Sequence, residues 1–215
     1  MNETDLVLHV DQEHRALQAA IIIGFFLSAL VSYWIIQTII SSAGINLIAA
    51  ALALVIGFLV SKGMEAWLKG RWRSGRRLYL SADRFYTQKG RRTEHEIDAN
   101  EDFDLLFWRF TVKRAGRIPK GWYLLSCAFH QSGNYLPVYS FMSAEEFDNF
   151  PQSERFVELA PKKNIAADDN FQLVGLQKRL HTAEVFRWNE GAELSKDDFR
   201  SFMGRLMQQF PSRGN

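Results

Sequence analysis

A long run without any charge dominates the N-terminal third of this chain. No residue between Arg15 and Lys62 is charged, and the run is 46 residues long. A helix needs roughly 20 apolar residues to cross a hydrocarbon core of about 30 Å, so the run is long enough for two crossings. A Gly44-Ile45-Asn46 break near its middle marks the turn between them. The sequence therefore predicts a membrane hairpin followed by a water-soluble domain.

The two spans are expected at 17–40 and 47–68, and both are expected to be helical because backbone amides in lipid must be satisfied within their own segment. A secretory signal peptide is an alternative interpretation of the first run, since small residues follow it at 41–43. The run is longer than the roughly 7 to 15 apolar residues of a signal, and acidic residues precede it at Asp5, Asp11 and Glu13. The hairpin is therefore the favoured interpretation.

Basic residues flank the hairpin on one side only. The turn at 41–46 carries none. The segment that follows the uncharged run carries one acid, Glu65, and six basic residues: Lys62, Lys69, Arg71, Arg73, Arg76 and Arg77. The positive-inside rule then predicts a multi-pass protein with both termini in the cytoplasm, which in a bacterium means the inner membrane. The lone Cys127 suits a reducing compartment, because no second cysteine exists for an internal disulfide.

The uncharged run of 46 residues contains no Asp, Glu, Lys, Arg or His, so it offers no ion path and no ligand for an intramembrane cofactor. Small residues instead recur at four-residue spacing on both helices: Gly24, Ser28 and Ser32, then Ala49, Ala53 and Gly57. This spacing places each set on one helix face, where two backbones can approach closely. Packing within the hairpin is the simplest use of these residues, and docking onto another membrane protein is the alternative.

After Arg71 the composition is that of one soluble domain. Strands are expected at 77–81, 84–88, 92–97, 103–112, 122–130 and 135–141, with Cys127 in the core. A capping-box pattern at Ser143 opens a short helix, and longer helices are expected at 168–188 and 196–210. The predicted division is an N-terminal cytoplasmic segment (1–16), the hairpin (17–68), a basic linker (69–76), a β domain (77–162) and a helical segment (163–215).

Enzyme chemistry is not predicted. The five His residues show no metal-ligand spacing, and the sequence has no Gly-rich phosphate loop, Gly-x-Ser-x-Gly or Cys-x-x-Cys motif. His95 lies between Glu94 and Glu96, but successive strand residues point to opposite faces, so the three do not converge. No catalytic residue, cofactor, metal or small-molecule substrate is therefore expected. The net charge of +2 is too small to indicate nucleic acid.

Two stretches of the soluble domain carry a resemblance to a known family. They are Leu78-Tyr79-Leu80-Ser81-Ala82-Asp83-Arg84-Phe85-Tyr86, and the strand Leu136-Pro137-Val138-Tyr139-Ser140-Phe141 followed by Ser143-Ala144-Glu145-Glu146-Phe147. With two spans ahead of them, residues 15 to 160 resemble the bacterial pleckstrin-homology-like (YcxB-like or bacterial PH) membrane proteins. The resemblance implies a cytoplasmic α+β domain, with a PH-like antiparallel sheet or barrel and C-terminal helices. It also implies scaffolding or surface-binding roles and no catalytic residues.

The leading hypothesis is a membrane-anchored, non-catalytic accessory or adaptor protein whose soluble domain binds another protein, as a subunit of a membrane complex. The alternative is a lipid-responsive sensor or signalling module, because basic residues near a bilayer are attracted to anionic headgroups. An enzyme is the third possibility. The candidate headgroup ligands lie in the linker and in a basic loop at 113–120: Arg71, Arg73, Arg76, Arg77, Lys113, Arg114, Arg117 and Lys120.

Overall fold

The computed structural model describes residues 5–11, 15–40, 46–72, 74–114, 116–161 and 171–211. The chain divides into two compact units. One is the segment Gln12–Ser74, and the other combines Met1–Asp11 with Gly75–Asn215. The second unit is therefore built from two pieces of chain, with the first unit inserted between them.

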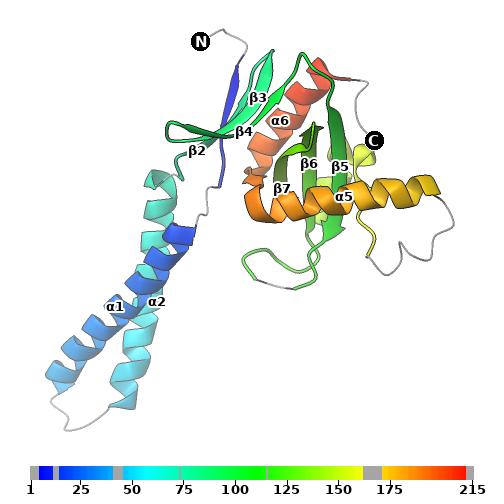
Figure 1. The fold of residues 1–215 in the computed structure, drawn as a ribbon. Coiled ribbons are helices and arrows are strands. Elements are labelled where there is room, and N and C mark those ends of the chain that lie inside the picture. The colour runs from blue at the N-terminus through cyan, green and yellow to red at the C-terminus, as the bar shows by residue number, and fades with distance from the viewer. Residues whose placement is uncertain are drawn as a thin grey trace. The chain divides into compact units, whose positions relative to one another are not determined.

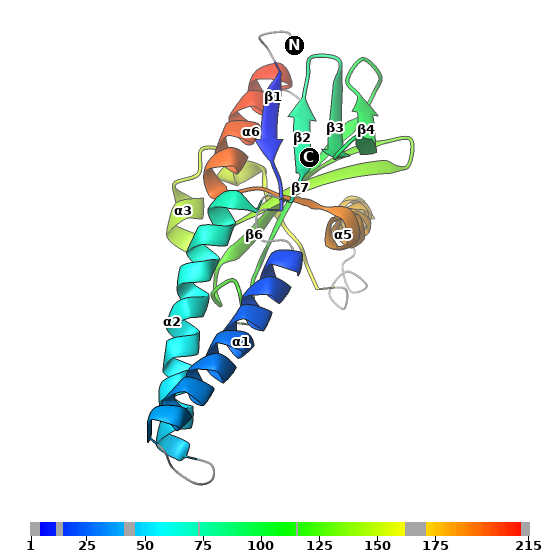
Figure 2. The same cartoon turned by 90° about the vertical axis from the view of Figure 1, so that its left-hand side faces the viewer.

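Two long apolar helices, α1 (Arg15–Ile40) and α2 (Leu47–Arg71), form the first unit (Figure 2). The side chain of Asn46 caps α2 by accepting hydrogen bonds from the backbone N–H groups of Ile48 and Ala49, at 3.0 and 3.2 Å. Segments 19–39 and 47–68 are each long and apolar enough to cross a membrane. The two helices predicted from the uncharged run are thus confirmed.

Two sheets form the second unit (Figure 1), and the described residues contribute nine strands to them. Sheet A is an antiparallel sheet in sequence order, with strands β1 (Leu6–His9), β2 (Arg76–Leu80), β3 (Arg84–Lys89) and β4 (Arg92–Asp98). Sheet B has the order β8-β5-β6-β7-β9, with strands β5 (Asp104–Thr111), β6 (Tyr123–Gln131), β7 (Asn134–Met142), β8 (Val157–Glu158) and β9 (Ala192–Glu193). Its three long strands are antiparallel, and β8 and β9 add parallel edges.

A closed barrel, which the family resemblance allowed, is not formed. The two sheets are separate, and the ladder is interrupted between β4 and β5. The outer edges of sheet B are occupied by the two-residue strands β8 and β9 instead of by strands of sheet A. The broader expectation of a sheet-rich domain with antiparallel sheets is confirmed.

Strand β1 was not expected from the sequence. It pairs with β2 along its whole length, from Leu6 opposite Leu80 to His9 opposite Arg77. Leu8 and Val10 are buried in the same core as the rest of sheet A. The alternating pattern is only a few residues long and stands directly before the hairpin, which is why local periodicity did not identify it.

Helix α6 (Lys196–Gln209) supplies the core of this unit. Its side chains pack with both sheets in one continuous cluster, together with the short helix α3 (Ala144–Asp148). The apolar stripe predicted for this helix comprises Phe199, Phe202, Met203, Leu206 and Phe210. The first four are fully buried, as is Cys127, and Phe210 is partly buried against the same core. Ser195 caps α6, accepting a hydrogen bond from the N–H of Asp198 at 3.1 Å.

Helix α5 (Phe171–Glu190) lies across the opposite face of sheet B (Figure 1). Leu180 and Ala183 of α5 pack on Leu106, Trp108 and Ala128. Both faces of β5 are therefore buried, which explains its nearly continuous run of apolar residues. A one-turn 3-10 helix η1 (Ser153–Arg155) leads into β8.

Candidate functional site

A groove of about 940 Å³ lies at the end of sheet B that α5 does not cover. Its floor is a row of neighbouring side chains on three strands, Phe110, Leu124 and Phe141, which the strand register places opposite one another. Val112 and Ile118 continue this apolar surface toward the β5–β6 loop. The floor is thus the part of the α5-facing side of sheet B on which no helix packs among the described residues.

The segment after β8 forms one wall because it turns away from the sheet. The N–H of Leu159 donates to the carbonyl of Arg109 at 2.9 Å, which is the last contact of this segment with β5. Gln177 of α5 then donates to the carbonyl of Glu158 and accepts from the N–H of Ala160, both at 3.0 Å. His181 Nε2 lies 2.9 Å from the carbonyl oxygen of Ala160. Side chains of α5 therefore satisfy this backbone in place of a neighbouring strand.

The C-terminal part of α5 forms the other wall, and it is held by a buried polar network. Trp108 Nε1 donates to a carboxylate oxygen of Glu184 at 2.9 Å. Arg187 donates to both oxygens of the same carboxylate at 2.6 and 2.8 Å, and its side chain is only 6 % exposed. The Arg187 guanidinium also lies 4.9 Å from the ring centroid of Tyr139. The charge of Arg187 in this wall is therefore balanced by Glu184.

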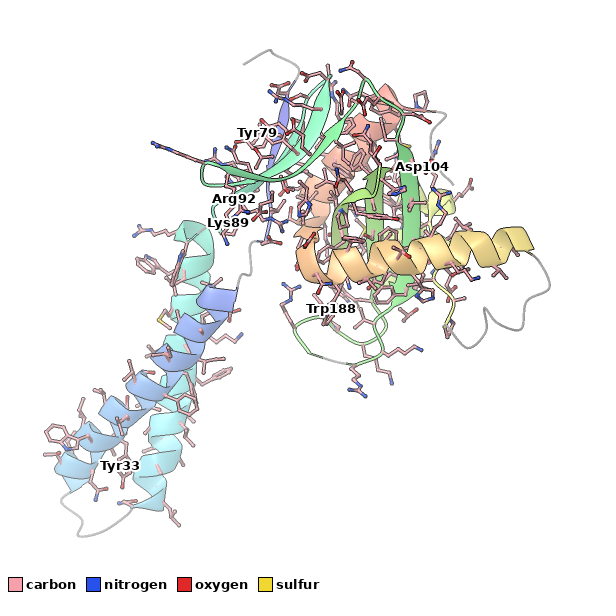
Figure 3. The ribbon with its side chains drawn as sticks, viewed as in Figure 1. Tyr33, Tyr79, Lys89, Arg92, Asp104 and Trp188 are labelled. Atoms are coloured by element: carbon pink, nitrogen blue, oxygen red, sulfur yellow. The ribbon has the colours of Figure 1, made fainter. Side chains whose placement is uncertain are left out.

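Trp188, the next residue on α5, is 79 % exposed and points to the side of the basic loop (Figure 3). Large aromatic side chains with one free face are typical anchors for a bound partner. The groove thus presents an apolar floor and an exposed indole at its rim.

The basic loop between β5 and β6 closes the groove on the third side. Lys113 and Arg114 line it, are exposed, and have no acidic partner among the residues that the structure describes. Arg117 also lines the groove, but it donates to Glu193 at 2.7 Å and lies over the ring of Phe141. Lys120 is exposed outside the groove. Three of the four predicted loop cations therefore meet at one site, and two of them remain available to an anionic group.

Arg76 has a structural role and is not available as a headgroup ligand. Its guanidinium pairs with Asp11 and Glu94, and donates to the backbone carbonyls of Glu190 and Gly191 at 2.7 and 2.9 Å. Burial alone would lower the pKa of Arg76, but the two carboxylates raise it further than burial lowers it. This residue joins β1, β2, β4 and the end of α5. The prediction that Arg76 binds lipid headgroups rests only on its place in a basic run.

Of the remaining linker cations, Arg77 is described in the same unit as the groove and does not line it. Arg77 is exposed on sheet A, and Arg71 lies over the ring of Trp67 within the hairpin unit, 4.9 Å from its centroid. Arg73 lies outside the described residues.

The predicted small residues of the hairpin face the partner helix at several positions. Ala49 and Ala53 are buried, and a Cβ atom added at Gly57 would lie 2.9 Å from the Cβ of Ala29. A Cβ atom at Gly24 would collide with Met64. Ser28 donates to the carbonyl of Phe25 in its own helix at 3.0 Å, and Ser32 is half-buried. Close packing inside the hairpin thus accounts for most of this set.

A second hollow, of about 620 Å³, lies around Arg76 and is lined almost wholly by charged side chains. Arg76 pairs with two of these carboxylates, and His95 Nε2 lies 3.3 Å from a carboxylate oxygen of Glu190. Glu94 and Glu96 have different Arg partners, so they do not converge with His95. No group of three possible metal ligands occurs within the described part of the chain. The apolar groove is therefore the stronger candidate site.

Sequence reasoning did not identify the α5 wall. The signal was present as an acid and a base three residues apart, Glu184 and Arg187, next to Trp188. Nothing local distinguishes that pattern from a solvated helix, since the partners Trp108 and Tyr139 come from distant strands. Comparison with protein-family models, with curated proteins and with solved structures found no match to this chain, so no family is assigned.

Proposed function

We propose that this chain is a membrane-anchored, non-catalytic adaptor that binds a segment of another protein in the groove beside the basic loop. The observation that carries the proposal is the uncovered apolar end of sheet B, with Trp188 and two available cations at its rim. An apolar concave surface with a few polar groups is the usual form of a binding site. Among the described residues that line it there is no assembled set of reactive side chains, which favours binding over chemistry.

Membrane anchoring is supported by the surface of the hairpin. Large apolar side chains point outward along both helices, among them Phe26, Trp34 and Ile39 at 65, 72 and 76 % exposure. Exposure of this apolar surface to water would be strongly unfavourable, whereas its contact with lipid tails would be favourable. The small residues between the helices, by contrast, are covered.

Cytoplasmic termini are supported by the way the chain leaves and re-enters sheet A. Strands β1 and β2 pair directly, and the N–H of Val10 donates to the carbonyl of Arg76 at 3.2 Å. The hairpin therefore departs from and returns to one sheet, so both of its ends belong on the same side of a membrane. Its basic flank then favours the cytoplasmic side, in a bacterium that of the inner membrane.

Site-specific photocrosslinking in cells tests the adaptor function. A photoreactive phenylalanine analogue replacing Trp188 should form a discrete adduct with another protein at native expression levels. The matched control replaces Val185, which is 55 % exposed on the same helix but does not line the groove. Adducts from both positions alike, or none from position 188, would contradict the proposal.

A lipid-responsive sensor is the second candidate, and one observation favours it. Lys113, Arg114 and Lys120 are exposed cations in a single loop, and each cation near an anionic bilayer contributes roughly 1 kcal/mol to binding. The concave shape of the groove fits a bound segment better than a flat bilayer surface, which places this function second.

A further inference from the structure

The uncovered groove also contains an open strand edge. The register of β8 with β5 comprises only Trp108 and Arg109, and beyond Arg109 no described residue pairs with the outer edge of β5. The N–H of Val112 donates inward to the carbonyl of Trp122 at 2.7 Å. Because the backbone groups of successive strand residues alternate in direction, the N–H and C=O of Thr111 point outward into the groove.

The charges of the groove have a definite sign. Its lining contains four basic residues and two acidic ones, Glu158 and Glu184. Arg187 is neutralised by Glu184, Arg117 pairs with Glu193, and Glu158 lies 3.5 Å from Arg109. Lys113 and Arg114 are left, both exposed and close in sequence to the open edge at Thr111. An occupant with carboxylates at this end would therefore be favoured.

We infer that the groove binds an extended, acidic polypeptide segment that continues sheet B where β8 leaves it. The occupant's backbone pairs with the outward N–H and C=O of Thr111, and its carboxylates face Lys113 and Arg114. An apolar side chain of the occupant packs on the floor beside Trp188. Addition of a strand to an exposed sheet edge is a common mode of peptide recognition, in which backbone bonds give affinity and pockets give selectivity. This inference rests on the proposed adaptor function and specifies the chemistry of the partner.

A proline substitution isolates the backbone contact. Thr111→Pro removes only an outward N–H, and proline is tolerated at edge positions whose N–H does not take part in the ladder. Thr111→Val is the matched control because it keeps the N–H. For the charges, Lys113→Gln/Arg114→Gln is compared with Arg77→Gln/Lys178→Gln, which removes two exposed cations outside the groove. Near-UV circular dichroism verifies that each variant is folded.

The probe is a displayed library of random linear peptides selected against the full chain in lipid nanodiscs. Selected peptides should be enriched in Asp and Glu alternating with apolar residues. Their affinity should fall about tenfold with Thr111→Pro, and about tenfold at low salt with the double loop variant. Both control variants should bind like the parent chain.

Three results would overturn the inference. They are a library that yields no binder, binders without acidic enrichment, and binders unaffected by both groove variants. Anionic vesicles that displace the peptides, and whose binding needs Lys113 and Arg114 but tolerates Thr111→Pro, would instead assign the site to a lipid surface. A protein adduct at position 188 combined with any of these results would leave the adaptor function standing and reject only the acidic extended segment. Absence of that adduct would reject the function itself.

Discussion

Arg76 stands in a run of basic residues, yet its side chain belongs to the interior of the globular unit. The carboxylate of Asp11 is 65 positions away in the chain, and the carbonyl groups of Glu190 and Gly191 are more than 110 positions away. Partners at such sequence separations cannot be identified from local sequence patterns. A basic residue next to a span is therefore an ambiguous signal, which can mean topology, lipid contact or internal structure.

Arg76→Met is expected to lower the free energy of unfolding of the globular unit by about 2–3 kcal/mol, because it leaves two carboxylates and two carbonyls without their donor. The partial exposure of Asp11 and Glu94 keeps the loss below that of a fully buried pair. Urea unfolding of the full chain in mild detergent, followed by Trp fluorescence, measures the effect. Arg77→Met on the same strand should stay within about 0.5 kcal/mol of the parent. Equal losses in the two variants would mean that Arg76 has no structural role.

At the scale of elements, one carboxylate joins two helices. Glu146 completes the capping box of α3 by accepting from the Ser143 N–H at 2.8 Å, and it accepts from Lys196 at the start of α6 at 2.7 Å. The Lys196 ammonium and the Ser143 N–H lower the pKa of Glu146 from 4.5 to about 2. The sequence predicted the cap, but only the fold brought Lys196 to it.

This lowered pKa makes stability depend on pH in a defined window. A carboxyl group with a depressed folded pKa adds stability above its unfolded pKa of 4.5 and loses that contribution as pH falls toward about 2. Glu146→Gln should therefore be less stable than the parent at pH 7, and the difference should shrink between pH 4.5 and 2. Thermal melts across this range measure it. Glu145→Gln, an exposed neighbour, should show no such convergence.

The two hairpin helices offer a matched pair of glycines. A Cβ atom at Gly57 would meet α1, whereas nothing lies within 4 Å of a Cβ atom at Gly63. Gly57→Leu should therefore separate the helices and lower the SDS fraction at which the hairpin comes apart, while Gly63→Leu should not. Circular dichroism and proteolysis during an SDS titration follow the transition. Identical titrations for the two variants would show that close packing at Gly57 does not hold the hairpin.

At the scale of the whole molecule, the insertion of the hairpin between β1 and β2 predicts the topology of the chain. In a Cys127→Ser background, Ser42→Cys in the turn should be labelled by an impermeant maleimide in intact cells. Ser201→Cys, exposed on α6, should be labelled only after lysis. Burial raises the pKa of the Cys127 thiol, so that residue adds little background even in the parent chain. Labelling at 201 but not at 42 would invert the orientation.

The sequence alone determined the two long helices, the six main strands, the capping box at Ser143 and the buried Cys127. These features depend on charge gaps, on periods of two and 3.6 residues, and on residues three positions apart, all of which are local. The choice between an open sheet and a closed barrel was left open by the sequence, because strand patterns identify strands without stating which edges pair.

Tertiary structure alone decided the groove, the role of Arg76 and the place of β1. The groove exists because α5 crosses sheet B beside the row of Phe110, Leu124 and Phe141 and leaves that row open, and because Gln177 and His181 bind the backbone of the segment that leaves the edge of β5. Lys113 and Arg114 were visible as a basic loop, but their apolar neighbours come from β7 and α5, far along the chain. A site assembled from such distant segments depends on pairings that no local pattern encodes.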